Sequence, residues 1–319
     1  MTTLDAELRV RKGIVALTGN AHVGIEWDPS EDYKGPVDGT YVTDGWGGSA
    51  EDSRVFSDNG SAEPYDLGDG YSMPMFEDTW IDPDTLEPIH NPATGTWYTH
   101  AQYFTEVLVG GPDRTAAGGT YDGNVTIASK TGFYYNATTG VYKTGTAANA
   151  IVPNPNDHFI LKKTTSPIIQ INGAIHIDGD LTFDKADLYY TGRAAIMVEG
   201  TVTNKASLLT VNSKTNVNDY ANSFPVRNCM GLMSRGDMIL CPTGVSQTRI
   251  MGAFYSAGLV SSAMQTVAMG TMIGTNFEMG NQVPDIYQVP SLARNLPLGM
   301  IGDYPILRVK LASWREIGV

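Results

Sequence analysis

Apolar and polar residues alternate over short stretches in the second half of the chain. In several of these stretches apolar side chains stand at every second position, as in a β-strand with one buried face. The clearest stretches are 168–172, 174–178, 180–184, 195–199 and 237–241. Gly, Asn or Asp stands at almost every junction, and no helical periodicity of comparable strength interrupts the series. The pattern predicts short strands joined by tight corners.

A β-solenoid explains such strands best, because each coil buries its apolar face against the next coil. The glycines between the strands follow no strict period, so we expect a mainly β fold with an irregular, right-handed solenoid. We assign an N-terminal segment with the first strands to 1–26. An acidic, aromatic, loop-rich region with short hairpins follows at 27–159, the solenoid at 160–290 and a C-terminal cap at 291–319.

Composition favours an extracellular β protein over a cytosolic enzyme. Charged residues make up 17% of the chain, below the roughly 25% typical of globular proteins, and there are 35 Gly and 17 Pro. The net charge is −13, and positions 26–92 hold 17 acidic residues against Lys34 and Arg54. This acidic block argues against non-specific nucleic-acid binding in that region, because it repels phosphate backbones.

The sequence shows neither an N-terminal signal-peptide core nor an apolar run of about 18 residues. We therefore expect no membrane segment in this chain. The composition still indicates an extracellular, cell-surface or periplasmic protein whose targeting segment is not part of the sequence. Cys229 and Cys241 leave two alternatives open, a disulfide between neighbouring coils or two buried thiols.

Three sets of stretches resemble a known family. They are 17–23 (LTGNAHV); 229–240 (CMGLMSRGDMIL) with 251–258 (MGAFYSAG); and 270–276 (GTMIGTN) with 289–297 (VPSLARNLP) and 313–316 (SWRE). Together they resemble the extracellular domains of PilX-like minor pilins and pilus-assembly proteins of bacteria. The resemblance implies a non-enzymatic structural or adhesive role in a type IV pilus-like system. Its implied partners are other pilus subunits, further copies of the chain, or a surface glycan or protein ligand.

Two acidic stretches are candidate calcium sites, since Ca²⁺ prefers carboxylate and carbonyl oxygens in loops. Neither matches an EF-hand loop, and solvated loop acids are the alternative interpretation. Calcium is the one cofactor that the sequence indicates. The candidate ligands are Asp28, Glu31 and Asp32 in the first stretch, and Asp82, Asp84 and Glu87 in the second.

Aromatic residues in the acidic loops are candidate ligand surfaces, because rings beside carboxylates suit sugars or cations. Internal packing of the loops is the alternative. The candidates are Trp27, Trp46, Trp80 and Trp97. We expect binding where these loops meet the first strands of the solenoid.

A carbohydrate-active β-helix enzyme is an alternative function, since such enzymes use paired carboxylates. The candidates are Asp178, Asp180, Asp184 and Asp187, although Asp also favours turns. We find no nucleophile elbow, zinc-binding His pair, phosphate-binding loop or dinucleotide fingerprint, and we predict that the chain is not an enzyme. A phage or surface-layer structural protein is a further alternative.

Overall fold

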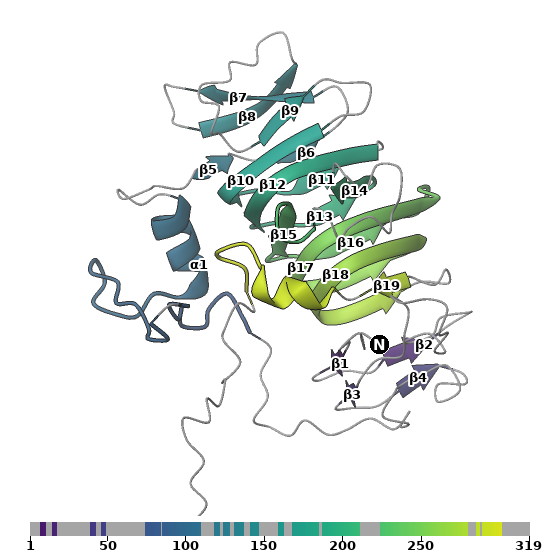
Figure 1. The fold of residues 1–319 in the computed structure, drawn as a ribbon, viewed down its shortest axis with the longest axis horizontal. Helices are drawn as coiled ribbons and strands as arrows, with labels where there is room; N and C mark the ends of the chain where they lie inside the picture. Colours follow the sequence, from purple (N-terminus) through teal and green to yellow (C-terminus); the bar gives the residue numbers. More distant parts are fainter. Residues whose placement is uncertain are drawn as a thin grey trace, which may run out of the picture.

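A computed structural model describes the chain in segments. The described residues are 7–10, 15–17, 39–42, 46–48, 74–83, 85–109, 118–121, 124–127, 131–136, 141–146, 159–162, 168–184, 187–210, 224–279, 285–287 and 289–301. The protein is mainly β, and its parallel strands form a β-solenoid of about four turns, which confirms the predicted fold (Figure 1).

Two parallel ladders run along the solenoid. The first joins, in order, β5 (Gly118–Tyr121), β10 (Ile168–Ile177), β12 (Asp187–Val198), β15 (Cys229–Ser234), β17 (Gln247–Ser262) and β18 (Gln265–Met279). The second joins β6 (Val125–Ile127), β11 (Leu181–Phe183), β13 (Val202–Asn204), β16 (Met238–Cys241) and the C-terminal part of β17. The parallel pairing therefore already includes strands that precede position 160.

Shorter elements complete the described chain. The strands are β14 (Ser207–Thr210) on β12 and β17, β19 (Asp285–Tyr287) on β18, β9 (Phe159–Lys162) antiparallel on β10, and the hairpin of β7 (Thr131–Asn136) and β8 (Val141–Thr146). Two small parallel sheets pair β1 (Glu7–Val10) with β3 (Gly39–Val42) and β2 (Val15–Leu17) with β4 (Trp46–Gly48). The helical elements are α1 (His100–Gln102), the π-helix η2 (Tyr103–Val109) and the 3₁₀-helix η5 (Pro290–Arg294).

The core is a stack of apolar side chains from successive coils. Parallel register places Ile175, Ile196, Leu232 and Phe254 at equivalent positions, and all four are buried. In-register strands lie about 4.8 Å apart, so each side chain covers the one before it. The coils differ in length. Ile175 pairs with Ile196, 21 positions later, whereas Gln247 pairs with Gln265, 18 positions later.

The corner between the two ladders is held by side-chain acceptors. The Asp180 carboxylate accepts a hydrogen bond of 2.8 Å from the Thr201 N–H, one coil further on. Asp237 repeats this contact with the Leu259 N–H at 2.9 Å. These acids satisfy backbone donors that the corner leaves free of sheet pairing. Asp180, a candidate for a carboxylate pair, is therefore engaged as a corner residue.

The described part of the C-terminal region lies on the outer face of the first ladder. Gly231 in β15 lets Met300 approach closely, because a Cβ at Gly231 would overlap the Met300 side chain. The Ile301 N–H donates to the Met233 sulfur at 3.3 Å. Positions 302–319, which include the rest of the expected cap, lie outside the described residues.

Candidate functional site

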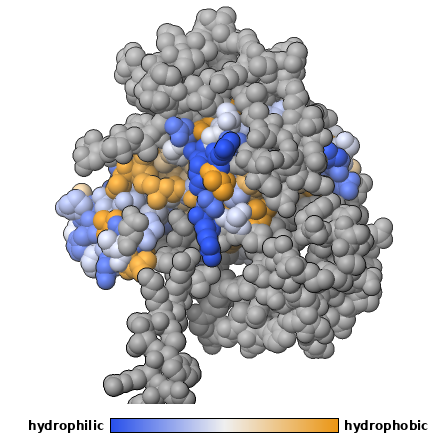
Figure 2. Space-filling model, viewed as in Figure 1, coloured by the Kyte–Doolittle hydropathy of each residue, from blue (hydrophilic) through white to orange (hydrophobic). Residues whose placement is uncertain are grey.

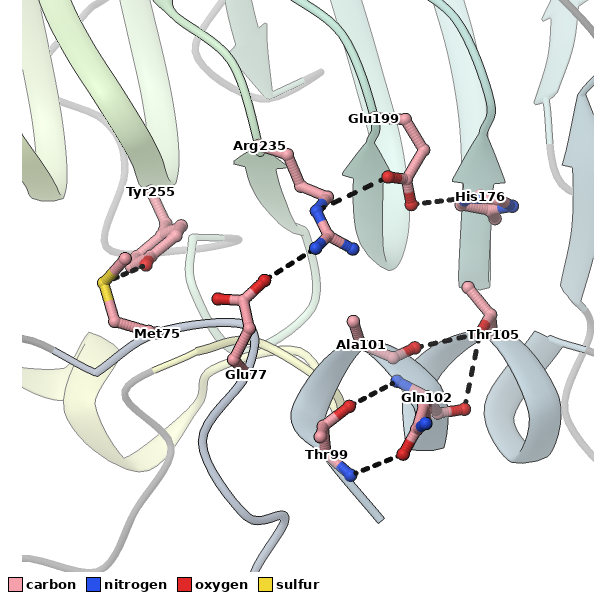
Figure 3. A network of polar contacts seen from close by, with 10 residues as sticks. All are labelled: Met75, Glu77, Thr99, Ala101, Gln102, Thr105, His176, Glu199, Arg235 and Tyr255. Carbon is pink, nitrogen blue, oxygen red and sulfur yellow. Dashed lines mark hydrogen bonds and ion pairs between the residues drawn. The ribbon is translucent and has the colours of Figure 1, made fainter. Parts of the chain in front are cut away.

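Three successive coils place charged side chains at one edge of the first ladder. His176 is the penultimate residue of β10, Glu199 directly follows β12, and Arg235 directly follows β15. The strand ends are in register, since Ile177 pairs with Val198 and Val198 with Ser234. The parallel register therefore brings the three side chains together (Figure 3). We call His176, Glu199, Arg235 and Glu77 the charged row.

The members of the charged row contact one another directly. The His176 Nε2 lies 3.0 Å from one carboxylate oxygen of Glu199, and the Arg235 Nε lies 3.5 Å from the other. A second Arg235 nitrogen donates to Glu77 at 2.6 Å. Arg235 thereby links the solenoid to the segment that precedes α1, and its guanidinium also lies 5.3 Å from the ring centre of Phe76.

The hydrogen bond from His176 lowers the pKa of the Glu199 carboxyl, and Arg235 adds to this effect while partial burial opposes it. A carboxyl with a lowered pKa in the folded state stabilises the protein above its unfolded pKa. That contribution is lost as the pH falls through the folded pKa.

We expect Glu199→Gln to lower the free energy of unfolding at pH 7 by no more than about 1 kcal/mol, since the pair is partly exposed. The difference from the parent protein should vanish below the folded pKa of Glu199, where the parent carboxyl is itself neutral. Urea unfolding of both proteins at a series of pH values measures this difference in the free energy of unfolding. Glu278→Gln, an exposed carboxyl on β18, is the control. An unchanged difference at acid pH would contradict the role of the charge.

The segment 74–109 is fixed to the outer face of the solenoid by further contacts. The Tyr255 hydroxyl in β17 donates to the Pro74 carbonyl at 2.7 Å, and the Tyr255 ring meets the edge of Phe76 at 5.3 Å. Part of the acidic block thus lies on the solenoid, as expected from the sequence. These contacts fall on β17 and just beyond the end of β15, while η2 of the same segment packs against β5 and β10 in the first coils. Ligand binding where the segment meets the solenoid stays a prediction.

Aromatic packing holds this segment together. Trp80 is buried and stacks on Tyr103 with ring centres 4.4 Å apart. It is therefore a packing residue and not the exposed ligand surface that the sequence allowed. Trp97 is exposed and contacts His90 edge to face at 4.4 Å. Trp27 and the side chain of Trp46 lie outside the described residues.

His100, the first residue of α1, lies within the same packing. Its ring is 4.9 Å from Trp80 and 6.4 Å from Phe76, measured between ring centres. Burial lowers the pKa of His100 to about 4, against a smaller opposing effect of a hydrogen bond with the Met300 backbone. The imidazole is therefore neutral at physiological pH.

The predicted calcium ligands are only partly described. The Asp82 carboxylate accepts from the Thr85 N–H at 3.2 Å, and Glu87 is exposed in the same turn. Asp84, Asp28, Glu31 and Asp32 lie outside the described residues. Within the described part of the chain, no three His, Cys, Asp or Glu residues are placed to share a metal ion.

Calcium binding stays a prediction. If the acidic loops hold Ca²⁺, removal of calcium by a chelator should lower Tm, because a bound ion stabilises the folded state by mass action. Restoring calcium should raise Tm again, and magnesium serves as the control. An unchanged Tm after chelation would rule out a stabilising calcium ion.

The structure contains the two cysteines as buried free thiols. Cys229 begins β15 and Cys241 ends β16 within the same coil. Of the two alternatives from the sequence, the structure therefore has the thiols and not the disulfide. Burial raises the pKa of Cys229 to about 12, which keeps this thiol protonated and unreactive.

No family model, curated protein or solved structure matches this chain. Among the helices that the structure describes, none has the length and apolar character needed to cross a membrane.

The charged row was not predicted from the sequence. None of its four residues was among the candidate site residues. The available signal was the position of each member beside a strand end, but the spacing differs from coil to coil. Glu199 follows His176 by 23 positions, whereas Arg235 follows Glu199 by 36.

Proposed function

We propose that this protein is a non-enzymatic, exported structural or adhesive component of a type IV pilus-like system. The observation that carries the proposal is the attachment of the acidic segment to the solenoid through Arg235, Glu77 and Tyr255. A solenoid is a stiff stack in which each coil supports the next. Loops fixed to a rigid scaffold commonly form binding surfaces. The resemblance to PilX-like proteins adds the pilus context.

The pairing within the charged row supports a structural role. Both carboxylate oxygens of Glu199 are engaged, one by His176 and one by Arg235. Arg235 is also held by Glu77. A general acid or base needs an oxygen or nitrogen within reach of a substrate proton. In this arrangement the charges bind one another and connect two parts of the chain.

Location within the cell tests the proposal. An epitope-tagged copy of the gene, expressed in its native organism, should appear in the periplasm or on the surface. Proteinase added to intact cells and immunogold labelling distinguish these two locations, and deletion of the gene should alter surface filaments. A cytosolic protein whose deletion leaves the filaments unchanged would overturn the proposal. Labelling of phage particles or a surface layer would favour the alternative structural roles.

A carbohydrate-active enzyme is the second candidate, favoured by one observation. Acidic and basic side chains from three coils converge on one face of the solenoid (Figure 3). Incubation of the purified protein with a panel of acidic and neutral polysaccharides separates the two functions. We expect no shortened chains or unsaturated products. Product release that Glu199→Gln abolishes would establish the enzyme instead.

A further inference from the structure

Five large apolar side chains of the described residues are highly exposed. Four of them fall in two parts of the fold, and the fifth, Ile286, lies on β19. Leu86 is 56% exposed and Trp97 is 49% exposed, and both belong to the irregular hairpin 79–99. Val226 is 61% exposed and Leu298 is 54% exposed, and both lie beside the start of β15. Exposed apolar groups that lie together often mark interaction sites. We call the two places the hairpin surface and the clamp surface.

The hairpin surface is acidic and well ordered by its own contacts. Positions 79–99 contain three acidic residues, Asp82, Asp84 and Glu87, and no Lys or Arg. The backbone N–H of Trp80 donates to the backbone carbonyl of Tyr98 at 2.8 Å. Antiparallel β-bridges join Thr79 with Thr99 and His90 with Trp97. Glu87 is exposed next to Leu86. The hairpin therefore presents apolar groups beside negative charge.

The clamp surface is held together by one arginine. The Arg193 guanidinium donates to the carbonyls of Pro225 and Val226, and also to those of Asn295 and Leu296. It thus joins a turn before β15 to the segment that follows η5. Leu298 lies two residues beyond Leu296.

The clamp surface carries the opposite charge to the hairpin. Positions 224–228 and 289–301 contain two arginines, Arg227 and Arg294, and no acidic residue. Both arginines are exposed. Figure 2 shows hydrophilic residues in blue with apolar residues in orange beside them over the middle of the face on which η5 lies in Figure 1. The clamp surface therefore presents apolar groups beside positive charge.

We propose that the hairpin surface of one copy binds the clamp surface of a second copy. The two surfaces are complementary in charge, and each offers two exposed apolar side chains. They do not cover each other within one chain, because all four apolar side chains remain about half exposed or more. Contact between them therefore requires two molecules.

Such a contact is heterologous, since it joins two different surfaces. Repetition of a heterologous contact produces a closed ring or an open filament. The inference names a partner for the structural role proposed above. Its test measures association of the purified protein and does not depend on cellular location, so either proposal can fail without the other.

Sedimentation velocity of the purified full chain over a range of concentrations tests the proposal. We expect species larger than a dimer at high concentration, and weaker association at about 0.5 M salt than at about 0.05 M salt, because salt screens the paired charges. Arg227→Glu with Arg294→Glu should weaken association at least about tenfold. Glu87→Arg alone should weaken it as well.

Charge exchange and an unrelated arginine provide the controls. Glu87→Arg combined with Arg227→Glu in one chain should restore part of the association, because the reversed surfaces again match. Arg249→Glu, at an exposed position of β17, makes the same charge change elsewhere and should leave association unchanged. Circular dichroism confirms that each variant folds. A protein that stays monomeric, or that associates regardless of these substitutions, would overturn the proposal.

Discussion

Replacing Gly192 by alanine is expected to remove most of the stability of the solenoid, at a cost of more than about 4 kcal/mol. Gly192 lies within β12 at a φ of +98°, a conformation that L-residues with a Cβ rarely adopt. A Cβ at this position would also lie far inside the van der Waals distance of the Ile171 carbonyl oxygen in the preceding coil. The coils would have to separate to accommodate it. Urea unfolding followed by circular dichroism measures the loss.

Gly244→Ala is a matched control, because Gly244 has a similar φ of +90° but no atom within 4 Å of an added Cβ. It should lose only the backbone contribution, about 1–2 kcal/mol. The difference between the two variants therefore isolates the close approach of one coil to the next. Equal losses would mean that backbone conformation alone accounts for the glycine at 192.

The solenoid could be predicted because its signals are local. Alternating residues at 168–172 and 174–178 mark β10, although the structure joins them into one strand through Gly173, which takes a φ of +73°. Asp180 was recognisable as a corner residue from the turn preference of Asp, whereas the sequence pattern placed Asp237 in a strand. β7 and β8 pair antiparallel within the region to which the sequence assigned short hairpins.

The charged row depends on register, which the sequence does not state. Each member must fall at the same edge of a different coil, and the coils have unequal lengths. The pairing of Arg193 with Cys229, 36 positions later, shows that this coil holds more residues than the one from Ile175 to Ile196, which takes 21 positions. A repeat search with one period therefore misses Arg235.

Burial of Trp80 likewise depends on tertiary structure. Four tryptophans in acidic loops looked equivalent in sequence, but Trp80 stacks on Tyr103 while Trp97 is exposed. The stacking partner comes from η2, more than twenty positions further along the chain. The local composition of the loop carries no information about that contact.

Acidification from pH 7 to pH 4 is expected to lower the free energy of unfolding by about 3 kcal/mol through His100 alone. The pKa of this imidazole is about 4 in the folded protein, against 6.5 for an unperturbed histidine, because burial disfavours the charged form. Between these two values the unfolded chain binds more protons than the folded one. Stability from this source is therefore complete above pH 6.5 and falls steadily until about pH 4.

His100→Phe should remove this dependence, since phenylalanine keeps an aromatic ring beside Trp80 and Phe76 but binds no proton. Unfolding by urea at intervals between pH 7 and pH 4 gives the two curves to compare. His90→Phe, at an exposed position of the same segment, should retain the parent curve. Parallel curves for the parent protein and His100→Phe would place the acid sensitivity in other groups.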